Sequence, residues 1–86
     1  MSNDNLGGKL IPLSDLSVGA KAQVFQLLTT GLPRRRMLDL GLIPGTRVEV
    51  IRRSPLGDPV AYNIRGASIA LRAEESQQIL VKQINK

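Results

Sequence analysis

The chain has 86 residues and a net charge of +5, and 42% of its residues are hydrophobic. A chain this short supports one hydrophobic core, and its near-average apolar content argues against disorder throughout. It has no cysteine and no histidine, which excludes disulfides, thiolate or imidazole metal sites and the usual base of a nucleophilic triad. We therefore expect no enzyme, no cofactor and no tight transition metal site.

Residues 1–8 are mostly polar and include paired glycines, so they offer little to a core. We expect a disordered N-terminal segment over 1–8 and a single domain over 9–86. A secretory signal needs a basic start and roughly 7–15 apolar residues, which are missing here. No apolar run approaches the ~20 residues that cross a bilayer. The sequence predicts a cytoplasmic protein without direct membrane insertion.

The first half of the domain predicts two strands and one helix. The short apolar segment 10–13 contains a proline, which is typical of an edge strand, and residues 20–28 favour a second strand. Pro33 has the fixed φ that suits a first helical turn, and Gly41 suits the C′ position. We expect a short helical insertion at about 33–40.

The second half predicts two hairpins and a closing strand. Pro44 and Gly45 suit the central positions of a type II turn and precede the strand 46–53, which has a clear two-residue period. Further strands are expected at 60–65, 68–72 and 79–84, with a helical turn at about 73–78. The expected structural turn residues are Gly41, Pro44, Gly45, Gly57, Pro59 and Gly66. These elements indicate a mostly β fold, a small barrel, because curling the sheet closed protects its edges.

Three arginines, Arg34 to Arg36, fall in the first turn of the expected helix. Positive charge there opposes the helix macrodipole by roughly 0.3–1 kcal/mol per residue. One interpretation is a solvated face in which Arg35 or Arg36 pairs with Asp39 at a helical spacing. A second is a docking patch for an acidic partner, and a third is an arginine finger that completes the GTPase site of another protein.

Leu56 lies at the tip of the first expected hairpin. Its side chain either folds back onto the barrel or contacts a partner, and the sequence leaves both interpretations open. Six of the twelve basic residues fall between Arg34 and Arg53, which indicates an anionic partner for this region. The candidate partner-binding residues are Arg34, Arg35, Arg36, Arg52, Arg53, Leu56 and Asp58.

Two other binding functions have weaker support. The phosphate-binding pattern G-x-x-x-x-G-K-[ST] and the pattern G-x-G-x-x-G are both absent, which argues against nucleotide binding. The positive charge is compatible with a basic barrel that binds nucleic acid. However, base stacking contributes roughly 1–3 kcal/mol per base, and the chain has only Phe25 and Tyr62 as aromatic residues, which we expect to pack in the fold.

Two turn motifs at a fixed separation carry a resemblance to a known family. They are R-M-L-D-L-G-L-I-P-G-T over 36–46 and P-L-G-D-P over 55–59, followed by Arg65-Gly66 and by I-A-L-R over 69–72. Over about residues 10–84 the chain resembles the FeoA family, ferrous iron transport protein A. The same small domain is found fused to metal-dependent transcription regulators.

The resemblance implies an SH3-like barrel with a helical insertion. It also implies an adaptor that binds the cytoplasmic, GTPase-containing part of a FeoB-type ferrous iron transporter and regulates iron uptake. This would place the protein in the cytoplasm or, through its partner, at the inner face of the membrane. No catalytic or metal-binding residue carries over from the family, so transition metal ion binding is a label of the family alone. Self-association and a carboxylate-based metal sensor stay open as alternatives.

Overall fold

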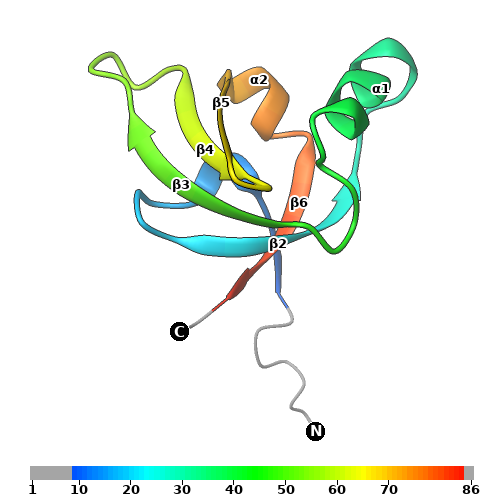
Figure 1. Cartoon of the computed structure of the whole chain (residues 1–86), viewed down its shortest axis with the longest axis horizontal. Coiled ribbons are helices and arrows are strands. Elements are labelled where there is room, and N and C mark those ends of the chain that lie inside the picture. The colour runs from blue at the N-terminus through cyan, green and yellow to red at the C-terminus, as the bar shows by residue number, and fades with distance from the viewer. Residues whose placement is uncertain (1–8, 85–86) are drawn as a thin grey trace, which may run out of the picture.

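The structure is a computed structural model that describes residues 9–84 (Figure 1). The disorder predicted for residues 1–8 lies outside the described residues. The elements, in chain order, are β1 (Leu10–Pro12), a 3-10 helix (Leu13–Asp15), β2 (Lys21–Leu27), α1 (Gly31–Asp39), β3 (Arg47–Arg53), β4 (Val60–Ile64), β5 (Ala67–Leu71), α2 (Ala73–Ser76) and β6 (Ile79–Ile84). The predicted strands are confirmed, with ends that shift by at most one residue.

The six strands form one curled antiparallel sheet in the order β1-β6-β2-β3-β4-β5. Register shifts between Val24 and Gln26 and between Val50 and Arg52 mark bulges in β2 and β3, and such bulges bend a strand and increase its twist. The mostly β barrel is confirmed. Its ladder is not closed, however, because within residues 9–84 no hydrogen-bonded pairing joins β1 to β5.

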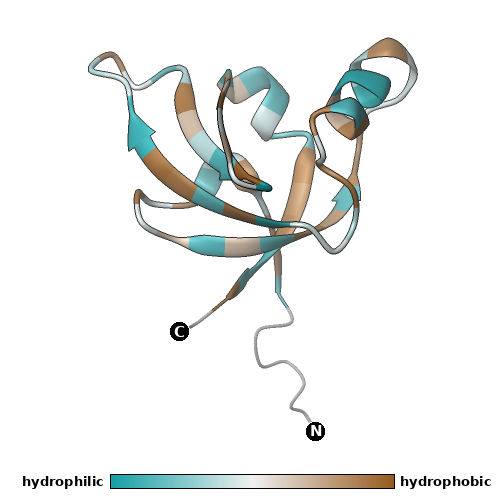
Figure 2. Ribbon diagram, in the orientation of Figure 1, coloured by the Kyte–Doolittle hydropathy of each residue, from teal (hydrophilic) through white to brown (hydrophobic). Residues whose placement is uncertain are grey.

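The core lies inside the curl, because alternate residues of the strands point inward. Figure 2 shows this alternation of hydrophobic and hydrophilic residues along β2 and β3. The buried hydrophobic residues are Leu13, Leu16, Ala22, Val24, Leu27, Met37, Leu42, Val48, Val50, Val60, Tyr62, Ile64, Leu71, Ile79 and Val81. The core is therefore aliphatic except for one tyrosine.

Helix α1 begins at Gly31, two residues before the predicted start, and Pro33 stands in its first turn. It ends at Asp39, and Gly41, at the predicted C′ position, has a φ of 97°, a left-handed conformation that favours glycine. The Gly41 N–H donates to the Leu38 carbonyl and the Leu42 N–H donates to the Met37 carbonyl, both over 3.0 Å. These two bonds make a Schellman motif, in which the buried side chains of Leu42 and Met37 anchor the end of the helix.

The start and the end of the described chain lie side by side. Leu10 of β1 pairs with Lys82 of β6 in the antiparallel ladder. Figure 1 shows the beginning of β1 and the end of β6 at the lower side of the molecule, whereas α1 and α2 lie at the upper side. The two helices therefore lie on the side of the molecule opposite to the beginning of β1 and the end of β6.

Candidate protein-binding surfaces

The first candidate surface is the outer side of α1. Arg34 and Arg35 are exposed there, and neither forms an ion pair within residues 9–84. Together with Gly31, Leu38 and Asp39 they line a shallow hollow of about 360 Å³. An exposed pair of unpaired cations beside a hollow is available to an acidic partner.

Arg36 differs from the two arginines before it. It forms an ion pair with Glu75 of α2 rather than with Asp39, the partner expected at a helical spacing. The Glu75 carboxylate also accepts a hydrogen bond from the backbone N–H of Arg72 over 3.0 Å, at the start of α2. Glu75 therefore connects the two helices. Arg36 and Glu75 are 39 residues apart in the sequence, so a local sequence pattern does not predict that they pair.

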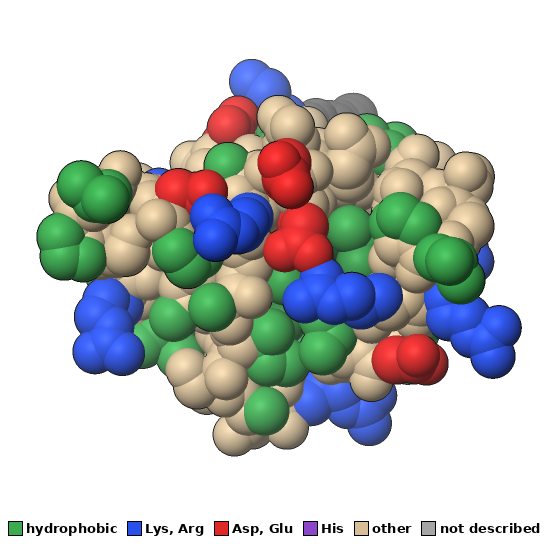
Figure 3. Space-filling view, turned by 90° about the horizontal axis from the view of Figure 1, so that it is seen from above, with side chains coloured by type: hydrophobic (Ala, Val, Ile, Leu, Met, Phe, Trp, Pro, Cys, Tyr) green, Lys and Arg blue, Asp and Glu red, His purple; other side chains and the backbone are tan. Residues whose placement is uncertain are grey.

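A groove of about 780 Å³ separates α1 from α2. Its lining mixes apolar and charged side chains, and it includes Leu28, Leu32, Met37, Arg36, Glu74 and Glu75. Leu32 is 82% exposed at its edge. Figure 3 shows hydrophobic and charged side chains intermixed on the helical side of the molecule. The part that α2 plays here could not be predicted from the sequence, because only the fold brings Glu74 and Glu75 beside α1.

The second candidate surface is the tip of the β3–β4 hairpin. Leu56 is 95% exposed, so the interpretation that it folds back onto the barrel is wrong. Figure 1 shows this hairpin and α1 at opposite ends of the molecule. The structure therefore does not bring Leu56 and the arginines of α1 into one surface.

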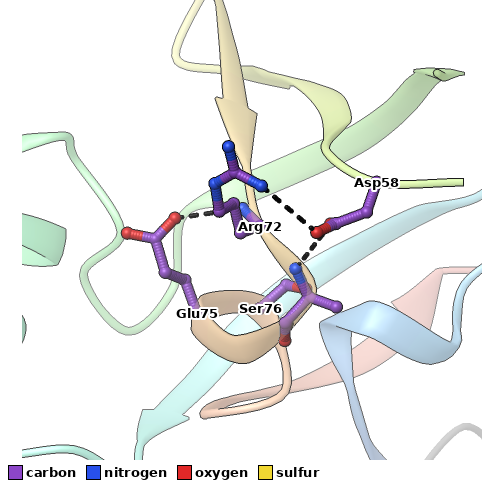
Figure 4. A network of polar contacts seen from close by, with 5 residues as sticks. Asp58, Arg72, Glu75 and Ser76 are labelled. Carbon is purple, nitrogen blue, oxygen red and sulfur yellow. Dashed lines mark hydrogen bonds and ion pairs between the residues drawn. The ribbon is translucent and has the colours of Figure 1, made fainter. Parts of the chain in front are cut away.

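The remaining predicted site residues, Arg52, Arg53 and Asp58, lie where the β3–β4 loop meets the two strands. Arg52 is exposed, whereas Arg53 donates a hydrogen bond from its guanidinium to the Leu16 carbonyl over 3.2 Å. Asp58 Oδ1 accepts a hydrogen bond from the Ala73 N–H over 2.8 Å (Figure 4). Asp58 Oδ2 lies 3.7 Å from Arg72 Nη1. The contacts of Arg53 and Asp58 thus hold the hairpin to the rest of the domain.

Tyr62 is buried in the core, with only 1% of its surface exposed. Burial raises the pKa of Tyr62 above its ordinary value of 10.0, and a hydrogen bond to Ser76 offsets part of the rise. Ser76 is itself buried, and its hydroxyl donates to the Ala73 carbonyl over 3.4 Å. Burial thus favours the neutral form of Tyr62.

The raised pKa of Tyr62 predicts a loss of stability at alkaline pH. In the unfolded chain the phenol ionises near 10.0, whereas the folded protein holds its proton to higher pH. The stability that this group contributes is complete below pH 10.0 and is lost as pH rises through the folded-state pKa. Urea unfolding midpoints measured from pH 8 upward should show this loss. Tyr62→Phe is the matched control, because it removes the phenol and keeps the ring, and an equal decline in both proteins would contradict the prediction.

Two further questions about the described part of the chain concern a metal site and a membrane-spanning helix. Among residues 9–84, no three side chains of the metal-ligating types Asp and Glu gather into a group that could hold a metal ion. In the same span, no helix has the length and apolar character needed to cross a bilayer.

Comparisons with known proteins give one consistent match. The family model FeoA domain matches residues 11–83. The chain is 34% identical over 73 residues to the Fe(2+) transport protein A/Fe(2+) transporter FeoB fusion protein of Porphyromonas gingivalis. That match covers 85% of this chain but only 9% of the fusion protein, so this chain corresponds to a small part of it.

Solved structures with the same fold include two from this family. One is the FeoA protein of Chlorobium tepidum, with 36% identity and a TM-score of 0.82, covering 87% of this chain and 71% of that one. The other is Stenotrophomonas maltophilia FeoA complexed with zinc, presented as a prokaryotic SH3 domain protein. It has 25% identity and a TM-score of 0.75, covering 84% and 89% of the two chains. The SH3-like character of the barrel follows from this likeness.

Proposed function

The chain belongs to the FeoA family, whose members take part in ferrous iron transport, and on this premise we propose that it is an adaptor of a FeoB-type transporter. It binds the cytoplasmic, GTPase-containing part of that transporter and regulates iron uptake. The fusion protein of Porphyromonas gingivalis supports this proposal, because it joins the two components in one polypeptide. A covalent link holds two domains at high effective concentration, which favours a contact between them.

The outer side of α1 is the surface that suits this contact best. Arg34 and Arg35 are exposed and unpaired within the described residues. Leu32, at the edge of the neighbouring groove between α1 and α2, adds an apolar side chain that is 82% exposed. Arginine is enriched at protein interfaces, because its planar guanidinium forms bidentate contacts with carboxylates. The proposed partner surface is acidic. The protein acts through binding, without turnover, and is held at the inner face of the membrane by its partner.

Nucleic acid binding is a weaker candidate on this structure. Tyr62 is buried, as expected, but Phe25 is 48% exposed, which the sequence analysis did not anticipate. The Lys82 ammonium lies 5.6 Å from the centroid of the Phe25 ring. A single aromatic ring that is already covered by a cation offers little to a stacked base.

The adaptor function is tested by calorimetric titration of the protein against the detergent-solubilised FeoB-type transporter of the same cell. The titration is run with and without a GTP analogue, and a labelled oligonucleotide serves as the comparison ligand. We expect saturable binding to the transporter, and an affinity that depends on the nucleotide would indicate coupling to the GTPase cycle. An absence of binding in both nucleotide states, with folded protein, would contradict the proposal.

A further inference from the structure

Strand β5 is an edge of the sheet without the usual protection. Among residues 9–84 it pairs only with β4, and its five residues, A-S-I-A-L, include no charge and no proline. The β4–β5 register runs without a shift. Natural edge strands are blunted by lysine, proline, bulges or shortness. The opposite edge follows this rule, because β1 has three residues and contains Pro12.

The hydrogen bonding of the β4–β5 hairpin shows which backbone groups of β5 are free. A two-residue turn, Arg65-Gly66, connects the strands, and Ile64 pairs with Ala67 across it. Such a flanking pair exchanges both of its hydrogen bonds, and the pairs then alternate along an antiparallel ladder. Ser68 and Ala70 therefore direct their N–H and C=O groups away from β4. Both residues are exposed, so these groups are accessible.

We propose that β5 binds an extended acidic segment of a partner protein, which adds to the sheet as a seventh strand. Backbone hydrogen bonds to Ser68 and Ala70 supply the pairing. Arg65 and Arg72 flank β5 at its two ends, and β5 itself carries no carboxylate. Arg72 lies 3.7 Å from Asp58, and 65% of its side chain is exposed. The segment that fits this edge therefore has carboxylates near both of its ends.

Charge argues against a second copy of this chain as the added strand. An antiparallel pair of β5 strands, centred on Ile69, would place Arg65 of one copy close to Arg72 of the other. Like charges that face each other across strands are destabilising. An acidic segment meets the same two arginines with the opposite charge. This inference rests on β5 alone and does not require the α1 surface or the transporter.

The test uses a capped peptide of alternating valine and threonine with one glutamate at each end. It is titrated into the ¹⁵N-labelled protein and followed by amide chemical shifts. We expect the largest shifts, and slowed amide hydrogen exchange, at Ser68 and Ala70. A peptide with lysine ends should bind more weakly. A peptide whose strand-pairing amides are N-methylated should lose about fivefold to tenfold in affinity for each hydrogen bond removed.

The matched variants are Ala70→Pro and Ala70→Thr. Proline removes the outward N–H that the peptide needs and leaves the β4 ladder intact, whereas threonine keeps the N–H. We expect about tenfold weaker binding for Ala70→Pro and wild-type binding for Ala70→Thr. Shifts centred on the groove between α1 and α2, equal binding of the N-methylated peptide, dimerisation through β5, or no binding at millimolar peptide would each overturn the proposal.

Discussion

Replacing Leu42 by alanine is expected to lower the free energy of unfolding by about 2–5 kcal/mol. Leu42 is 0% exposed, and its N–H completes the Schellman motif at the end of α1. The substitution removes buried methyl groups and leaves a cavity that the surrounding strands can fill only in part. A small domain is stable by about 5–15 kcal/mol, so the loss is a large share of the total. Urea unfolding followed by far-UV circular dichroism measures it.

Leu32→Ala is the control for this prediction, because it makes the same chemical change at an exposed position of α1. Leu32 is 82% exposed, and surface substitutions of this kind usually change stability by less than about 0.5 kcal/mol. Equal costs for Leu42→Ala and Leu32→Ala would show that Leu42 does not anchor α1 in the core.

The double variant Arg34→Glu/Arg35→Glu is expected to weaken binding to the FeoB-type transporter by about tenfold or more, which corresponds to ~1.4 kcal/mol. Reversing both charges turns an attraction to an acidic surface into a repulsion. Neither arginine forms an ion pair within residues 9–84. Because α1 begins at Gly31, the prediction that Arg34 to Arg36 all fall in its first turn is wrong, since Arg35 and Arg36 lie beyond that turn. The macrodipole effect falls off within the first turn, so the unfolding free energy should change little. Calorimetric titration at low and high salt measures the affinity, and the difference from wild type should shrink as salt screens the charges.

Lys21→Glu/Arg47→Glu gives the matched control. Lys21 on β2 and Arg47 on β3 are both exposed, and their reversal changes the net charge by the same amount. We expect this protein to bind nearly as well as wild type. If both double variants lose affinity equally, the loss comes from net charge, and α1 is not the contact surface. If Leu56→Ser alone abolishes binding, the contact lies at the β3–β4 hairpin instead.

The turns of this fold could be predicted because their chemistry is local. Gly45 has a φ of 98°, and the Thr46 N–H donates to the Ile43 carbonyl over 3.0 Å, as the type II turn at Pro44 and Gly45 requires. The two hairpins and the glycine at the end of α1 are confirmed for the same reason. The start of α1 lies two residues before the predicted one. Thr30 is the N-cap, a residue type that favours this position, but the prediction relied on Pro33 alone.

The contacts between distant segments could not be predicted. The Arg36–Glu75 pair and the hydrogen bond from Ala73 to Asp58 join residues 39 and 15 positions apart, and no local pattern encodes either. The exposure of Leu56 depends on the direction in which the hairpin leaves the sheet. The open gap between β1 and β5 depends on the curvature of the whole sheet. The charge and hydrophobicity of the sequence thus indicate candidate residues, but only the fold shows which of these residues lie on the same surface.

The pairing of β1 with β6 has a consequence for how this domain can be built into larger proteins. Leu10 of β1 pairs with Lys82 of β6, and Figure 1 shows the beginning of β1 and the end of β6 on the side of the molecule away from α1 and α2. A polypeptide fused at either end would therefore leave the side that carries α1 and α2 accessible. A domain with this geometry can work as a separate molecule or as part of a fusion protein, and its proposed binding surfaces stay the same in both. The fusion protein of Porphyromonas gingivalis, which joins Fe(2+) transport protein A to the transporter FeoB, is an example of such a fusion.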